Sequence, residues 1–371
     1  MASHSHVKKL TLLESSFIFI VAAYALWSLW RMATTTIPDF SVLFHSAVNL
    51  RSGVSLYHDT TLFTGLGYPA VSLLPYMPFT ILPYTMAVWL WIAVSCVAYL
   101  SVTYLSLRLT GMQSLRLWAL VSAVGFLAFP TKFTFGMGQV NFIALSLLLL
   151  GTSTLRMPAV LRVVLLIISL LFKPHFVFVY VGLLFSTSRK YIVASFIGVL
   201  LLFFGVGVVT RWIPDREYLY DMVPSLLGYH GREIYYNQGI GGYVSRLFGS
   251  NSAFISYLAI LAVACGSIYA LAKKKLSITN VIAILLPMQV LIEPLAWQHH
   301  LVFLLPTFVI LWFTATSKDA WLKVFLVICF LLVGWNIKNP LYWQGNIIGS
   351  LVLSHGFMGC FMLWYMAIRK L

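Results

Sequence analysis

The chain has 371 residues, of which 61% are hydrophobic and only 9% are charged, and its mean hydropathy is +0.93. Soluble domains average about 25% charged residues, so this composition excludes an ordinary soluble fold and indicates an integral membrane protein. The net charge of +15 is interpreted below as topology and lipid contact, and we infer no nucleic-acid partner from it.

Apolar segments near 20 residues long recur along the whole chain, and each can cross about 30 Å of hydrocarbon as a helix. The ten-residue alternation of a membrane β-barrel is missing from the sequence, so helices are the only plausible spanning elements. We therefore predict an all-α polytopic membrane protein, a single domain over residues 1–371 with about 10–12 transmembrane helices. The candidate crossings are 11–30, 81–107, 115–130, 139–154, 159–172, 175–187, 191–210, 253–272, 277–292, 299–316, 320–336 and 345–368.

Three of these segments differ from a plain crossing. The first, 11–30, is longer than the apolar region of a signal peptide and no A-x-A site follows it, so we expect a retained helix. The segments 159–172 and 175–187 are short, and Lys173-Pro174-His175 separates them, so they are predicted to be one broken pair.

Alternating the connections across the membrane gathers fifteen of the 24 basic residues on one side. The positive-inside rule makes that side cytoplasmic, with both termini on it. Seven of the nine acidic residues fall on the other, outer side. The inner basic residues are Lys8, Lys9, Arg108, Arg116, Arg156, Arg162, Arg189, Lys190, Lys273, Lys274, Lys275, Lys318, Lys323, Arg369 and Lys370, and the outer acidic residues are Asp39, Asp59, Asp215, Glu217, Asp221, Glu233 and Glu293.

The outer side also receives the two long connections, 31–80 and 211–252. Loops of that length in a compact protein are usually functional, so the chemistry is expected to face outward. In the first of them, apolar residues recur at helical spacing from Phe40 to Leu50, which predicts an interfacial helix that ends at Gly53.

Asp39 stands at the start of this helix, and two interpretations remain open. It could be the N-cap of the helix, or it could be a carboxylate held at the outer surface and available as a base. The two are only partly compatible, because capping lowers the pKa of a carboxylate and weakens it as a base. Asp215 also follows a proline just outside a crossing and is the rival candidate.

Later parts of the two loops are less regular. Four prolines between Tyr68 and Pro83 exclude one straight helix and indicate a re-entrant or interfacial segment. The run Asn237-Gln238-Gly239-Ile240-Gly241-Gly242 is typical of a tight turn near a ligand, although ordinary loop chemistry explains it equally well.

Polar residues near the ends of apolar segments are costly and therefore informative. They are Gln139 and Asn141 at one crossing, Lys173 at the broken pair, and Glu293 with His299 and His300 between two later crossings. The predicted topology places all of them at the outer boundary, on the side of Asp39. Lys173 could instead snorkel to headgroups, and the histidines could be interfacial residues satisfied by water or backbone. Adjacent histidines on a helix point to different faces and the sequence has no H-E-x-x-H motif, which argues against a zinc site.

These residues, taken in order, resemble the membrane glycosyltransferases of family 87 in the C-type superfamily. The resemblance runs through most of the chain. Its motifs are Pro38-Asp39-Phe40, the spacing of Ala47, Gly53 and Tyr57, Tyr68-Pro69, Gly138-Gln139-Val140-Asn141, Lys173-Pro174, Asn237-Gln238 with Arg246, and His299-His300-Leu301 before Leu305-Pro306.

The resemblance implies a C-type helical bundle that transfers a hexose, most often mannose, from a polyprenyl-phosphate donor to a hydroxyl of a glycan or glycolipid acceptor with inversion. Asp39 matches the general base of the family. The expected donor-phosphate residues are Lys173, His299, His300 and Arg246, and the expected substrate-binding residues are His45, Tyr68, Gln139, Asn141, Asn237 and Glu293. No cofactor or metal is expected, and membrane lipids are expected partners.

Two other classes of function remain open from the residues themselves. A transporter or flippase of a lipid-linked or small polar solute would be expected to show paired, similar halves, for which the pairs Pro38-Asp39 and Pro214-Asp215 are the nearest sign. A non-catalytic membrane scaffold is the other.

Overall fold

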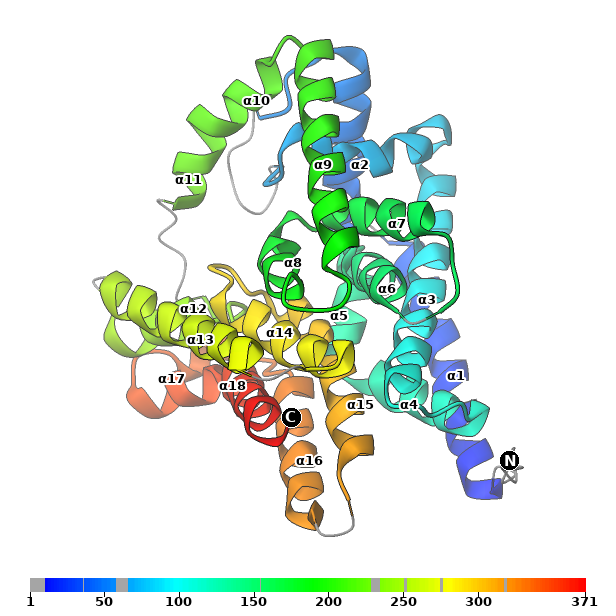
Figure 1. Cartoon of the computed structure of the whole chain (residues 1–371), viewed down its shortest axis with the longest axis vertical. Coiled ribbons are helices and arrows are strands. Elements are labelled where there is room, and N and C mark those ends of the chain that lie inside the picture. The colour runs from blue at the N-terminus through cyan, green and yellow to red at the C-terminus, as the bar shows by residue number, and fades with distance from the viewer. Residues whose placement is uncertain are drawn as a thin grey trace.

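The computed structural model describes residues 11–35, 37–57, 66–153, 155–227, 234–249, 252–273, 276–316 and 319–371. Within these ranges every regular element is helical, which confirms the predicted all-α class (Figure 1). Seven charged residues used for the topology lie outside the described residues: Lys8, Lys9, Asp59, Glu233, Lys274, Lys275 and Lys318.

The N-terminal half contains ten α-helices, some joined through tighter turns. Its α-helices are α1 (Leu12–Ala33), α2 (Pro38–Ser52), α3 (Tyr84–Leu109), α4 (Leu115–Leu127), α5 (Phe129–Met137), α6 (Asn141–Thr152), α7 (Ala159–Phe172), α8 (Val177–Leu183), α9 (Arg189–Val209) and α10 (Ile213–Glu217). Two 3-10 helices, η1 (Ala70–Ile81) and η2 (Pro174–Phe176), and the π-turn η3 (Tyr218–Met222) complete it.

The rest of the described chain, from Val223 onward, also consists of α-helices and short 3-10 helices. Its α-helices are α11 (Val223–Leu227), α12 (Ile240–Phe248), α13 (Ala253–Lys273), α14 (Ile278–Ile292), α15 (Leu305–Thr314), α16 (Ala320–Gly334), α17 (Ile347–Leu353) and α18 (His355–Lys370), with the 3-10 helices η5 (Gln298–Leu304) and η7 (Pro340–Trp343). In Figure 1, α10 and α11 extend from the end of α9 at the top of the view, while α15 and α16 run to the opposite end.

Each predicted crossing coincides with a helix, although the helices differ in length. Among the described residues four helices, α1, α3, α9 and α13, are long and apolar enough to span a bilayer alone. Counting each bent pair as one span raises this number to seven, and further apolar helices of 10–17 residues are shorter than a full crossing. The predicted break at Lys173 is confirmed, since the chain bends there by 119°.

The helix boundaries follow from local chemistry. Thr11 and Glu14 form a capping box on α1, and Ser114 and Ser277 cap α4 and α14 by accepting a backbone N–H. Prolines inside the segment 70–81 prevent an α-helix, as predicted, and this apolar stretch forms the 3-10 helix η1. Its predicted re-entrant or interfacial position stays a prediction.

The core beneath the candidate site is aromatic. The Trp91 indole of α3 stacks on Phe40 of α2 with ring centroids 4.7 Å apart, and on Tyr76 of η1 at 5.3 Å. Phe172, the last residue of α7, meets Tyr76 edge to face at 5.2 Å. These rings fix the start of α2 and the end of α7 against each other, which are the two places where Asp39 and Lys173 occur.

Candidate active site

Asp39 lies in the first turn of α2, and the structure corrects one of its two predicted roles. The N-cap is Ile37, Pro38 is the first helical residue, and no side chain makes a capping hydrogen bond. Proline is preferred at that first position because its missing N–H would have no partner there, and this shifts Asp39 one residue into the helix. The carboxylate is therefore not used as a cap, and the predicted helix itself is confirmed, with Gly53 ending it at φ 69°.

Instead, the Asp39 carboxylate accepts a hydrogen bond from the side-chain amide of Gln139. Gln139 is positioned by the preceding residue, Gly138, which ends α5 with φ 71° and packs directly against α2. A Cβ at Gly138 would lie 2.9 Å from the Cβ of Phe40, so only glycine allows this approach. The Trp91 indole N–H donates to the Gly138 carbonyl at 2.8 Å and holds the turn in place.

The environment of Asp39 suits a base near neutral pH. Partial burial raises the pKa of Asp39 to about 6, opposed by the Gln139 hydrogen bond and by attraction to the Lys173 charge. The side chain is half-buried rather than sealed, so an incoming hydroxyl could reach it. A pKa close to the working pH gives a general base both the right protonation state and useful proton affinity.

Lys173 is completely buried at the break between α7 and η2. Its ammonium lies 2.8 Å from Nε2 of His300 and donates to the Tyr68 hydroxyl at 3.4 Å. A buried ammonium is expensive unless it is paired, so the local structure must compensate it. Within the described residues these two acceptors use two of its three N–H groups, which leaves one for a ligand.

His300 and Glu293 extend this contact into a chain. Nδ1 of His300 lies 3.2 Å from one carboxylate oxygen of Glu293, and Nδ1 of His175 lies 2.6 Å from the other. If the Lys173 ammonium donates to Nε2 of His300, the proton of that imidazole must be on Nδ1, facing Glu293. Glu293 thus balances the Lys173 charge through His300 and anchors His175, whose side chain is 44% exposed.

His299 faces a different environment, as expected for adjacent histidines. Its carbonyl accepts from Asn141 at 2.9 Å and from Thr134 at 3.1 Å. Its ring packs on Phe133, and its Nδ1 is buried without a hydrogen-bond partner in the described part of the chain. Asn141 therefore positions the η5 backbone, whereas the unpartnered imidazole nitrogen remains available to a ligand.

Two other predicted residues brace the second outer loop. Asn237 donates to the Pro294 carbonyl at 3.0 Å and accepts from the Ala296 N–H at 3.1 Å. Arg246 donates to the carbonyls of Asn237 and Ile234 at 2.8 and 3.0 Å. Arg246 also donates to Ser354 at 2.9 Å, and burial lowers its pKa to about 10. These bonds tie the loop to the segment after Glu293 and to α18, and none of them joins Arg246 to Lys173 or His300.

The remaining candidates lie apart from the Lys173 contacts. His45 is exposed on α2 and stacks on Tyr84 with ring centroids 5.5 Å apart. Asp215, the rival base, is 4% exposed on α10, where burial raises its pKa, and one of its oxygens has no partner among the described residues. The Lys173 charge lowers the pKa of Asp39, whereas the pKa of Asp215 is set by burial and by its own backbone.

The sequence alone assigns no role to His175, which follows Lys173 and Pro174 at the broken pair. The sequence feature that could have indicated a role for His175 is Pro174, which forces a sharp break after α7. A polar residue directly after such a break lies close to Lys173 and its partners. Tyr57 was also noted only for spacing, and its hydroxyl donates to the Tyr68 carbonyl at 2.8 Å, which positions the tyrosine beside Lys173.

The fold and this cluster together define a polytopic helical membrane protein with a polar site at the breaks and ends of its helices. Comparison with known families then places it. The chain belongs to glycosyltransferase family 87, whose family model matches residues 66–337. That range contains Lys173, Glu293 and both histidines, while Asp39 precedes it.

Two curated relatives carry the same description, polyprenol-phosphate-mannose-dependent alpha-(1-2)-phosphatidylinositol pentamannoside mannosyltransferase. The one from Mycolicibacterium smegmatis is 26% identical over 250 residues, covering 64% of this chain and 59% of the relative. The one from Mycobacterium tuberculosis is 27% identical over 253 residues, covering 64% and 56%. The matched region is thus less than two-thirds of the length of either relative. No solved structure matches the chain.

Proposed function

We propose that the protein is a membrane hexosyltransferase that moves a sugar, mannose first, from a polyprenyl-phosphate donor to a hydroxyl of a glycolipid or glycan acceptor. Membership of family 87 supports sugar transfer, and the names of the two relatives support the mannose donor and a phosphatidylinositol mannoside acceptor. The observation that carries the proposal is the contact of buried Lys173 with His300, which in turn contacts Glu293, at a place where the Lys173 charge also acts on Asp39.

The proposed reaction is a single displacement. Asp39 takes the proton of the acceptor hydroxyl while the acceptor oxygen forms a bond to the anomeric carbon. The bond from that carbon to the phosphate oxygen breaks, its electron pair leaves with the polyprenyl phosphate, and the configuration inverts. The carboxylate ends protonated, so a pKa near 6 lets it release the proton to water after each turnover.

The leaving phosphate gains negative charge in a poorly solvated place, and the cluster around Lys173 is suited to receive it. The free N–H of the Lys173 ammonium and the unpartnered Nδ1 of His299 supply the donors, provided that this nitrogen carries the proton. Glu293 keeps His300 oriented so that its Nε2 accepts from Lys173 and fixes the direction of the ammonium. The proposal assigns no step to a metal ion.

We further propose that the site faces the outer side of the cell membrane and that both termini face the cytoplasm. Support comes from the basic residues in the short connections on the opposite side. Asp39, Lys173 and Glu293 occur at ends of helices that the predicted topology assigns to the outer boundary, where a lipid-linked sugar and a glycolipid headgroup can meet.

The test is transfer by the purified protein in proteoliposomes that contain polyprenyl-phosphate mannose and a phosphatidylinositol mannoside. Wild type should form the extended glycolipid, and Asp39→Asn should lower kcat by about 10²–10⁴-fold, because it keeps the shape but removes the base. Asp215→Asn is the matched control and should stay near wild-type activity. Full activity of Asp39→Asn would reject the base assignment, and solute flux without any glycosyl product would favour a transporter.

A further inference from the structure

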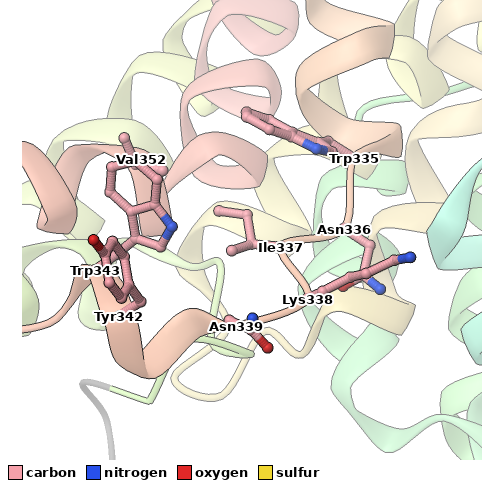
Figure 2. Close-up of a pocket in the computed structure, with 8 residues that line it drawn as sticks. All are labelled: Trp335, Asn336, Ile337, Lys338, Asn339, Tyr342, Trp343 and Val352. Atoms are coloured by element: carbon pink, nitrogen blue, oxygen red, sulfur yellow. The ribbon is translucent and has the colours of Figure 1, made fainter.

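The segment between α16 and α17 lines an open cavity at the protein surface that the proposed chemistry does not use. Its volume is about 440 Å³, within the range of small-ligand sites. Figure 2 shows Trp335 on one side, Tyr342 and Trp343 on the other, and Ile337 between them. The lining thus combines three aromatic rings with two amides and one ammonium, namely Trp335, Tyr342, Trp343, Asn336, Asn339 and Lys338.

The polar side chains of this lining are free. Among the described residues, no hydrogen bond or ion pair joins the side chains of Asn336, Lys338 or Asn339 to the rest of the protein. Asn339 precedes η7 as its N-cap without making a capping bond. Two carboxamides and an ammonium are therefore presented around the aromatic rings and are not used to hold the loop.

This combination fits the chemistry of a saccharide. The C–H face of a sugar ring packs on an aromatic ring, and its hydroxyls exchange hydrogen bonds with carboxamides, which both donate and accept. An aromatic belt at the membrane interface would also explain exposed tryptophan and tyrosine. It gives no reason for the rings to line one open cavity together with two amides and a lysine.

The backbone that carries the lining residues is held in place at two points. A Cβ at Gly349 of α17 would lie 1.7 Å from the Trp343 carbonyl, so this glycine lets η7 pack directly on α17. On the floor, the Ile337 N–H donates to the Tyr235 hydroxyl at 2.9 Å. A site whose walls are fixed before binding loses less conformational entropy when the ligand arrives.

The cavity is also joined to the candidate active site. Successive aromatic rings lie 5.3–5.9 Å apart along one path from the cavity to the cluster around Lys173. The path runs through Trp335, His355, Tyr235, Tyr236, Phe133 and His299. These rings are packed side chains and form no channel, so an acceptor that reaches both places has to run over the surface of the protein.

We propose that this cavity binds the sugar units of the acceptor that are remote from the reacting hydroxyl. The assignment of those sugars to the acceptor rests on the proposed function, whereas the binding of a saccharide does not. Tyr342 is the residue to change, because it is 84% exposed and its replacement should leave the fold intact. Leu341 is the matched control, since it is 77% exposed in the same 3-10 helix and does not line the cavity.

Two measurements test the proposal. In the first, a soluble mannose oligosaccharide is added to the purified full chain and binding is followed by saturation-transfer NMR, which needs no turnover. Wild type and Leu341→Ala should bind it, and Tyr342→Ala should bind it about tenfold more weakly. In the second, the KM for a phosphatidylinositol mannoside should rise about tenfold in Tyr342→Ala, with the KM for a simple alkyl mannoside unchanged.

Equal oligosaccharide binding by wild type and Tyr342→Ala, or no binding by either, would overturn the proposal. Equal losses in Leu341→Ala and Tyr342→Ala would also overturn it and assign the rings to membrane anchoring. If wild type binds the oligosaccharide but forms no glycosyl product, the cavity stands and the proposed function fails. If wild type transfers the sugar but Tyr342→Ala has an unchanged acceptor KM, the proposed function stands and the acceptor role of the cavity fails.

Discussion

Removing the Gln139 side-chain donor should shift the pH dependence of sugar transfer and leave the activity at high pH unchanged. The hydrogen bond from Gln139 stabilises the charged form of Asp39 and lowers its pKa, while burial raises it to about 6 overall. Gln139→Met keeps the length of the side chain and loses the amide. The pKa of Asp39 must then rise, so the carboxylate stays protonated, and inactive as a base, up to a higher pH.

The size of the shift can be worked out. A hydrogen bond to a charged group contributes about 1.5–3 kcal/mol, and one pKa unit corresponds to about 1.36 kcal/mol, which gives at most about two units. Asp39 is half-buried, so water replaces part of the lost bond and about one unit is expected. At pH 6.5 this lowers the deprotonated fraction by about threefold, and at pH 9 it changes nothing.

The assay is kcat/KM for transfer in proteoliposomes between pH 5 and 9, because its acid limb reports the free enzyme. The midpoint should move from near 6 to about 7 in Gln139→Met, with Gln344→Met, an exposed glutamine, as the control. A midpoint that does not move, or a loss of activity that is equal at every pH, would refute the assignment of Asp39 as the titrating base.

Three further outcomes are expected. Glu293→Gln leaves the Lys173 charge without its balance and should destabilise the protein by about 3–5 kcal/mol, measured as a lower Tm in detergent, and weaken donor binding. Gly138→Ala forces a Cβ into the contact with α2 at a positive φ, and should cost about 1–3 kcal/mol and lower kcat; an unchanged Tm would contradict the packing argument. Arg246→Met should lower the Tm while leaving the donor KM unchanged, and a raised donor KM would instead place Arg246 at the phosphate.

Helix positions were accessible from the sequence because they depend on local composition. Apolar runs predicted the long helices, and Gly53 predicted the end of α2. The prolines excluded a straight α-helix where the structure has the 3-10 helix η1. The helix α12 was not predicted, because its start at Ile240 falls in the glycine-rich run that indicated a tight turn. The start of α2 was less certain, since Pro38 and Asp39 both suit a helix N-terminus and only the backbone decides which residue is the cap.

The contacts of the site were only partly accessible. Hydropathy and topology predicted that Lys173, Glu293 and His300 would share one boundary, and the structure places them in contact. Their roles in catalysis stay predictions. The bond between Asp39 and Gln139 joins residues 100 positions apart and depends on how Gly138 packs on α2, which no local pattern encodes. The contact of His175 with the Glu293 carboxylate likewise depends on the bend after α7, whose direction no local pattern encodes.

The two charges of the site differ in burial in a way that suits opposite tasks. Lys173 is fully buried, so its charge is weakly screened and acts strongly on a phosphate brought beside it. Asp39 is only half-buried. In the proposed reaction it must remain so, because its proton has to reach water after each turnover. Full burial would hold the carboxylate protonated, and full exposure would return its pKa to the ordinary range and weaken it as a base. A helix start at the edge of the bundle therefore suits the base, and a break inside the bundle suits the cation.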